Sequence, residues 1–265
     1  METIAYKISL NCGDIVTCLP GIRQLYRQTG KKAIIYQTIG REVEHPEGTK
    51  HPVENDKGEA VTMNMRTFEM MKPLLEYQEY IQSYEVYKGQ TIDFDLDKPR
   101  EYNLSIIPYA PLHYYPSMIY PEMACDLSES WIDAPPIHGY EYTIFINRTF
   151  RYNNPHLNFF FLKEYKNYLQ FIGTINEYDS FKKEWGIDFP YYEVSDFLKL
   201  ASIIKFCKGI YGNQSFVYHL ANSMAIPRIL EVCSQYPNTW CTTKGGYPFL
   251  FQDALQFYFS KLYNQ

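Results

Sequence analysis

The sequence predicts an α/β protein with parallel sheets, arranged as two halves with a cleft between them. Short apolar segments of strand type alternate along the chain with segments in which apolar residues recur at helical spacing. This alternation is typical of βα units, whose strands pair in parallel. A proline-bearing segment near residues 130–141 separates two such series, so we expect a domain boundary there.

The expected elements follow the apolar pattern from one end of the chain to the other. The first half has strands over 6–10, 32–37 and 101–107, with helices over 15–26 and 67–81. The second half has strands over 142–147, 168–174, 203–212 and 228–232, with helices over 195–204, 215–224 and 249–263. Residues 38–66 are rich in Gly, Pro, Glu and Lys, and they interrupt the first half as a surface insertion that could form a small hairpin.

Length, composition and net charge indicate a folded protein with a substantial core and bear on nucleic-acid binding. The 265 residues are 46% hydrophobic, enough to bury a substantial core, and the net charge is −5. An acidic chain of this kind argues against binding to nucleic acid by charge alone, although a local basic groove stays compatible with it.

We expect neither a signal peptide nor a membrane span. The first ten residues are too polar for a signal peptide, and no apolar run approaches the roughly 18 residues of a membrane span. The six cysteines form no CxxC pair, which indicates reduced thiols and a cytoplasmic protein. Cys12 and Cys18 are expected to fill apolar space.

An aspartate stands where the first strand gives way to the first helix. The stretch NCGD, residues 11–14, places Asp14 in this loop. Ligands of open α/β sheets bind beyond the carboxyl ends of the strands, so these loops are where chemistry is expected. On this evidence Asp14 is either a helix N-cap or a catalytic acid or base.

A second polar segment follows the strand that ends near residue 212. Asn213 and Ser215 are suitable helix caps, and Ser215, His219 and Asn222 share one face of the helix that follows. A helix N-terminus favours an anion such as a diphosphate. A purely structural capped helix would show the same pattern.

The two segments together resemble a known family. GDIVTCLPGIRQL (13–25) is similar to the N-terminal signature of heptosyltransferase-like enzymes, glycosyltransferase family 9, and GNQSFVYHLANSMAIPRILEV (212–232) is similar to the donor-site signature of that family. The resemblance covers residues 5–37 and 141–232. It implies a GT-B architecture, in which two Rossmann-like domains face each other across a cleft.

The resemblance also implies the site. Asp14 corresponds to the catalytic base, and Asn11 and Gly13 lie beside it on the acceptor side. The residues that correspond to the donor-binding segments, and so hold the diphosphate and the sugar, are Arg148, Arg151, Asn213, Gln214, Ser215 and His219. The chain departs from the family in having Asn213 for an acid, Ser215 or Phe216 for a glycine, and arginine for a lysine.

The implied reaction is glycosyl transfer from a nucleotide-sugar to an acceptor hydroxyl, with inversion and without a metal or other cofactor. A saccharide or a lipid-linked saccharide is the favoured acceptor. The implied organisation is an acceptor-side domain over 1–138, a donor domain over 139–248, and a C-terminal segment over 249–265 whose helix packs back on the first domain.

Three alternatives stay open. DFDLD (93–97) could hold a metal through Asp93 and Asp95 in the manner of GT-A transferases. An acidic edge strand with Asp93, Asp95 and Asp97 on its solvent face has the same pattern. A glycosyltransferase acting on a hydroxylated DNA base is compatible but not favoured. The third is a non-catalytic binding protein on the same fold. His113 and His138, in proline-rich loops, are expected at the surface.

Overall fold

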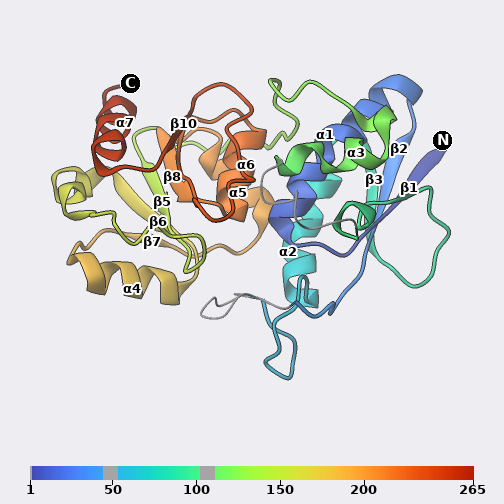
Figure 1. Cartoon of the computed structure of the whole chain (residues 1–265), viewed down its shortest axis with the longest axis horizontal. Coiled ribbons are helices and arrows are strands. Elements are labelled where there is room, and N and C mark those ends of the chain that lie inside the picture. Colours follow the sequence, from blue (N-terminus) through green and yellow to red (C-terminus); the bar gives the residue numbers. More distant parts are fainter. Residues whose placement is uncertain (1, 44–52, 102–110) are drawn as a thin grey trace.

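Two parallel sheets form the framework of the computed structural model, which describes residues 2–43, 53–101 and 111–265 (Figure 1). The first sheet has the order β3-β2-β1-β4 and the second the order β10-β9-β8-β5-β6-β7. All named strand pairs are parallel. The predicted fold class, α/β with two Rossmann-like halves, is confirmed.

The strands are short and lie at regular intervals along the chain. Those of the first sheet are β1 (Thr3–Ile8), β2 (Lys32–Gln37), β3 (Ile81–Val86) and β4 (Phe94–Asp95). Those of the second are β5 (Ile144–Asn147), β6 (Leu169–Ile172), β7 (Tyr191–Tyr192), β8 (Gly209–Asn213), β9 (Arg228–Glu231) and β10 (Gly246–Phe249).

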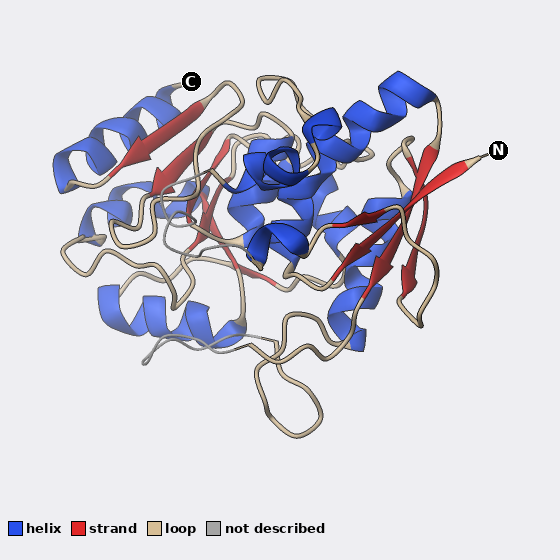
Figure 2. Ribbon diagram, turned by 45° about the vertical axis from the view of Figure 1, so that its right-hand side comes forward, coloured by secondary structure: helices blue, strands red, loops and turns tan. Residues whose placement is uncertain are grey.

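Helices connect the strands and cover the sheets. The α-helices are α1 (Cys12–Thr29), α2 (Met65–Glu76), α3 (Tyr115–Ile119), α4 (Ile175–Trp185), α5 (Phe197–Ile204), α6 (Phe216–Ser223) and α7 (Gln252–Asn264). The named 3-10 helices are η1 (Lys98–Arg100), η3 (Leu112–Tyr114), η4 (Pro121–Met123) and η5 (Phe160–Tyr168). The two sheets stand at opposite ends of the molecule, with helices between them (Figure 2).

The observed element boundaries differ from the expected ones where one apolar segment contains both the end of a helix and the start of a strand. The segment 67–81 is a helix only to Glu76, and β3 begins at Ile81, where Ile81 and Tyr84 are buried in the core. In the insertion 38–66, Glu54 pairs antiparallel with Ala60, as the expected hairpin requires. Most of the strand expected over 101–107 lies outside the described residues.

The last helix does not pack where it was expected. Leu255, Phe259 and Leu262 of α7 are buried in the core of the second sheet, together with strand residues such as Ile146 and Ile229. Figure 1 shows α7 at the end of the molecule farthest from the first sheet. The prediction that this helix packs on the first domain is therefore wrong, because its apolar face completes the core of the second sheet.

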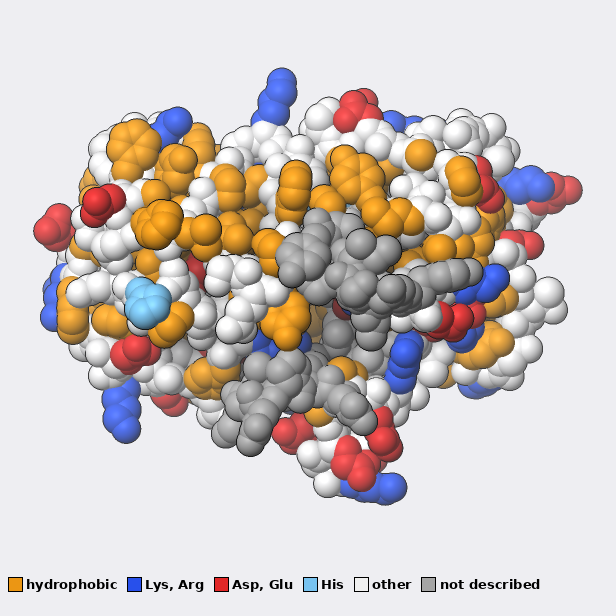
Figure 3. Space-filling view, viewed as in Figure 1, with side chains coloured by type: hydrophobic (Ala, Val, Ile, Leu, Met, Phe, Trp, Pro, Cys, Tyr) orange, Lys and Arg blue, Asp and Glu red, His pale blue; other side chains and the backbone are white. Residues whose placement is uncertain are grey.

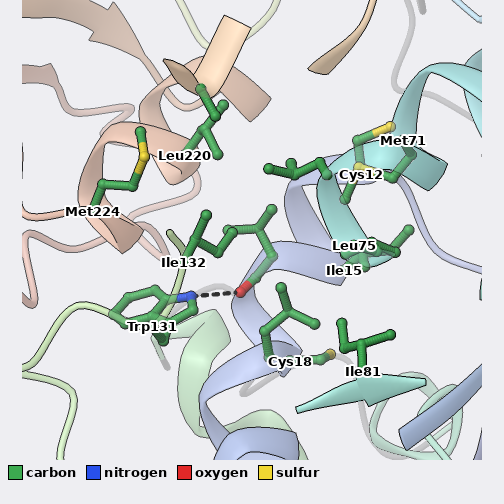
Figure 4. Close-up of a cluster of buried hydrophobic side chains, with 14 of the residues drawn as sticks. Cys12, Ile15, Cys18, Met71, Leu75, Ile81, Trp131, Ile132, Leu220 and Met224 are labelled. Atoms are coloured by element: carbon green, nitrogen blue, oxygen red, sulfur yellow. Dashed lines mark hydrogen bonds between the residues drawn. The ribbon is translucent and has the colours of Figure 1, made fainter. Parts of the chain in front are cut away.

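A single apolar core joins the two halves through their helices. Helix α1 packs against α6, and α2 packs against α5. Side chains from both halves share this core, among them Ile15, Met71 and Leu75 on one side and Leu220 and Met224 on the other (Figure 4). The expected cleft is thus closed along these helices by an apolar interface, here called the seam.

Trp131 connects both sides of the seam. Its indole Nε1 donates to the carbonyl oxygen of Val16 in α1 at 3.0 Å (Figure 4), and its backbone N–H donates to Ser223 in α6 at 2.9 Å. The side chain is 1% exposed. Burial of a large aromatic ring together with a satisfied polar atom makes this residue a strong contact between the halves.

Within the described residues, no helix has the length and apolar character that a membrane span requires.

We expect Trp131→Ala to destabilise the protein by about 3–5 kcal/mol, because it empties a buried aromatic site and removes the bond to Val16. Urea unfolding measures this change. Trp240→Ala is the matched control, since the Trp240 side chain is 52% exposed. Equal effects of the two substitutions would contradict a stabilising role for Trp131.

Candidate active site

Asp14 lies in the first turn of α1, directly beyond the carboxyl end of β1. Asn11 occupies the N-cap position, although its side chain makes no capping bond, so Asp14 is not the N-cap. A carboxylate in the first turn is stabilised by the helix dipole. The Asp14 side chain is 15% exposed, and the amide of Asn11 donates to its Oδ2 at 3.4 Å.

Arg100 holds the Asp14 carboxylate. Its Nη2 lies 2.5 Å from Asp14 Oδ1, and its guanidinium stacks over the Tyr115 ring at 5.4 Å. Burial acts to lower the pKa of Arg100, but the charges of Asp14 and Tyr115 raise it above its usual value. The hollow beside this pair has a volume of about 10 Å³, room for about one water molecule.

Sequence reasoning did not identify Arg100. It follows the edge strand β4, which pairs in parallel with β1 through Tyr6 and Phe94. Parallel pairing brings the segments after both strands to the same end of the sheet. The sequence feature that could have identified Arg100 was therefore a basic residue shortly after an acidic edge strand.

Arg148 forms a buried ion pair in the second half. Its Nε lies 3.1 Å from Glu231 Oε2, and the two side chains are 9% and 1% exposed. Glu231 also accepts from the Tyr211 hydroxyl and from the backbone of Asn154. The Arg148 guanidinium further stacks over the ring of Phe159 at 4.8 Å. Its charge is thus already neutralised by a buried partner.

Arg151 lies on the same loop as Arg148 but has a different environment. Its guanidinium stacks over the Tyr152 ring at 5.4 Å, and its side chain is partly exposed. Tyr152 has φ +59°, a left-handed conformation that non-glycine residues rarely adopt and that recurs at functional sites. Of the two predicted cations, Arg151 is the one available to a ligand.

Asn213 fixes this loop. Its amide nitrogen donates to the carbonyl oxygens of Thr149 and Arg151, at 3.2 and 2.5 Å, and its side-chain oxygen accepts from the Thr149 backbone. The side chain is fully buried. Asn213 therefore shapes the loop that carries Arg151.

The ring of Tyr152 lies 5.9 Å from that of Tyr236 in the second half. Burial raises the pKa of Tyr152; the charge of Arg151 opposes this shift, and the charge of Asp14 adds to it.

The remaining donor-side residues have structural partners. Ser215 caps α6 by accepting from the Tyr218 backbone at 3.3 Å, and it donates to Asn147 at 2.5 Å. Gln214 donates to the backbone of Tyr236 and accepts from that of Cys233. Asn222, expected on the same polar face, binds Thr242 and the Arg228 guanidinium instead.

His219 meets α1 at Gly13. A Cβ atom on Gly13 would lie 3.1 Å from His219 Cδ2, so glycine at this position permits the close approach of the two helices. His219 is 5% exposed, and its Nδ1 has no hydrogen-bond partner in the described part of the chain. Burial lowers the pKa of His219 to about 4, which the charge of Asp14 partly opposes.

His113 is buried as well, so its predicted surface position is wrong. It is 4% exposed, and its ring lies 5.4 Å from that of Trp131 and 5.8 Å from that of His219. The backbone N–H of the preceding residue, Leu112, donates to Asn238, so η3 is held against the second half. This long-range contact buries a residue that its proline-rich surroundings had placed in solvent.

The aspartates of the DFDLD segment bind protein groups. Asp93 and Asp97 accept from the backbone N–H groups of Ala5 and Ser9, both at 2.8 Å, and Lys7 lies 3.0 Å from Asp95. Asp97 is 4% exposed, so the expectation that all three face solvent is wrong for it. No cluster of three metal-ligating side chains occurs among the described residues.

The six cysteines are free. Cys12 and Cys18 are 8% and 5% exposed in the apolar core, and burial raises the pKa of each thiol to about 12. Both are therefore poor nucleophiles, and their predicted role as apolar filling is consistent with this environment.

Comparison with solved structures supports the fold. The chain is similar to a family 9 glycosyl transferase from Veillonella parvula DSM 2008, with TM-score 0.61, 10% identity, and coverage of 98% of this chain and 89% of that one. It is also similar to the E. coli heptosyltransferase WaaC with ADP (TM-score 0.61, 9% identity, 98% and 99% covered). E. coli ADP-heptose lps heptosyltransferase II gives TM-score 0.54, 10% identity, and 100% and 99% coverage.

Sequence comparison finds no relative. No family model matches the chain, and no curated protein matches it. At about 10% identity, the structural likeness shows the fold alone: a GT-B arrangement of the kind found in heptosyltransferases.

The two arginines of the donor-side loop are expected to differ on substitution. Arg148→Met removes one partner of a buried ion pair, so it should destabilise the protein by about 3–5 kcal/mol. Arg151→Met, the matched substitution at a partly exposed site, should change stability by less than about 0.5 kcal/mol. Chemical denaturation of both variants measures this, and a stable Arg148→Met protein would contradict the structural role.

Stability should fall in mild acid because of His219. Above pH 6.5 the imidazole is neutral in both states; between pH 6.5 and about 4 the unfolded chain binds a proton that the folded protein does not. The free energy of unfolding therefore decreases as the pH falls through this window. Denaturation of the wild type and of His219→Gln from pH 7 to 4.5 should give a shallower decrease in the variant.

The control for this measurement is His138→Gln, at a side chain that is 73% exposed. Parallel pH profiles for the wild type and His219→Gln would show that His219 does not titrate in this window.

Proposed function

We propose that the protein is a glycosyltransferase that moves a sugar from a nucleotide-sugar to an acceptor hydroxyl, with inversion and without a metal. One observation carries the proposal: Gly13, next to Asp14 in the first turn of α1, packs against His219 of α6, so Asp14 lies where the two halves meet. The GT-B fold, and the ADP in the structure of the similar E. coli enzyme, support a nucleotide-sugar donor.

Each group has a role in this reaction. Transfer develops negative charge on the departing diphosphate and requires removal of a proton from the acceptor hydroxyl. Arg151 and the N-terminus of α6 supply positive charge for the diphosphate. Asp14 acts as the base. A single displacement with this base inverts the anomeric centre.

The acceptor site is assigned to the first half. Asn11 and Gly13 lie at the carboxyl end of β1, where the ligands of open α/β sheets bind. A saccharide or a lipid-linked saccharide is the acceptor we favour. We assign the donor domain to residues 139–248 and the acceptor domain to residues 1–138.

A second candidate function follows from the Arg100–Asp14 ion pair. An arginine at 2.5 Å from the carboxylate competes with an acceptor hydroxyl for the base. If this pair persists in the presence of ligands, the protein binds a nucleotide-sugar without transferring the sugar.

Nucleotide binding is tested by thermal unfolding with ADP, GDP, UDP, CDP and dTDP, each with and without EDTA. A ligand that binds only the folded state raises the melting temperature by mass action. We expect one diphosphate to give a clear shift that EDTA leaves unchanged. A shift that EDTA abolishes would contradict metal-free binding, and no shift with any diphosphate would contradict the transferase.

Asp14→Asn tests the base. With the nucleotide-sugar that this panel selects and a set of saccharide acceptors, we expect transfer to fall by roughly 10²–10⁴-fold, because a neutral amide cannot take the proton. Diphosphate affinity should stay unchanged. Asp179→Asn, at an exposed aspartate of α4, is the matched control. Unchanged transfer in Asp14→Asn would exclude this residue as the base.

A further inference from the structure

Two buried imidazoles with unpartnered nitrogens lie close together at the seam. His113 comes from η3, which packs on α1, and His219 comes from α6 of the second half. Their ring centroids lie 5.8 Å apart. In the described part of the chain, both nitrogens of His113 and the Nδ1 of His219 are buried and unpartnered.

Such groups are uncommon in folded proteins. A buried polar atom without a partner costs about 1–3 kcal/mol, and most native structures avoid it unless the group has another use. Here two residues that are 4% and 5% exposed share this property at one place. The protein would be more stable with apolar side chains at these positions.

The surroundings of the pair favour an anion. Arg228 is fully buried and has no carboxylate partner among the described residues; it donates to backbone carbonyls and to Asn222. It lies at this part of the seam, because it donates to Asn222, three residues after His219 in α6; burial lowers the pKa of His113, and the charge of Arg228 lowers it further. The first turn of α6 adds the positive end of a helix dipole one turn from His219.

Among the described residues, one carboxylate acts on the pair. Asp14 of α1 acts on His219, and it is already paired with Arg100. The rings of Trp131 and Tyr218 also pack against the imidazoles. This part of the seam therefore combines a buried cation that has no carboxylate partner in the described residues with unused hydrogen-bonding atoms.

We propose that His113 is a donor-binding residue, which with His219 contacts the diphosphate of the nucleotide-sugar when the two halves separate. One imidazole comes from each half, so the ligand links the halves through these two side chains. This inference rests on the proposed function, because it assigns a further contact to the same donor. The diphosphate supplies the negative charge that the seam lacks.

Proton uptake accompanies this binding. Burial, and then the positive charge of Arg228, keep His113 neutral in the closed form. A diphosphate between the imidazoles stabilises their protonated forms, so protons are taken up from solvent. Titration calorimetry in buffers of different ionisation enthalpy measures the number of protons bound.

His113→Phe separates a ligand contact from a structural role. Phenylalanine keeps a ring against Trp131 and removes both unpartnered nitrogens, so the melting temperature should stay the same or rise. The affinity for the diphosphate that binds the wild type most tightly, among ADP, GDP, UDP, CDP and dTDP, should fall about 10- to 100-fold. Proton uptake at pH 7.5 should decrease with it.

Two further variants complete the test. His113→Gln retains an N–H donor and should keep an affinity between those of the wild type and His113→Phe. His138→Gln, at an exposed histidine, should bind as the wild type does. If one of the two His113 variants does not fold, the other still shows whether His113 contacts the diphosphate.

The outcomes separate the two proposals. Binding to the wild type with the same affinity and proton uptake in His113→Phe would overturn the role of His113 and leave the transferase intact. Failure of all five diphosphates to bind the wild type would overturn the proposed function and this inference together.

Discussion

The contact between the first turns of α1 and α6 determines the arrangement of the rest of the protein. Gly13 allows His219 to pack against the α1 backbone, and the apolar faces of the two helices then merge into one core with Trp131. Helix α1 follows β1 and helix α6 follows β8, and both strands are internal in their sheets. The contact between the helices therefore fixes the two sheets relative to each other. It also sets the first turn of α1, which carries Asp14, against the first turn of α6.

Local patterns were sufficient to predict most of the fold. The strand β2 coincides with its expected range, and Ser215 caps α6 as expected, because these features depend on neighbouring residues. The pairs Arg148–Glu231 and Arg100–Asp14 join residues 83 and 86 positions apart. Partner choice over such distances depends on tertiary packing, so the sequence identified polar residues near the site but could not show which were already paired.

Buried charge is distributed unequally in the second half. Arg148 has a buried carboxylate partner, Glu231, at the end of β9, whereas Arg228, at the start of β9, is held by carbonyl and amide oxygens in the described part of the chain. Isolating a cation in this way is costly unless its hydrogen bonds are satisfied, and Arg228 leaves its Nε unpartnered.

The path of the chain determines how the halves can separate. Because α7 stays on the second sheet, the described elements β1–β4 belong to the first sheet and β5–β10 with α7 to the second. Opening then requires loss of the α1–α6 and α2–α5 contacts but no movement of α7 relative to its sheet. A ligand that binds only the open form must supply the free energy of separating this apolar seam. Its apparent dissociation constant is therefore the intrinsic one divided by the fraction of protein that is open. Unpartnered imidazoles reduce the stability of the closed form and so lessen that cost.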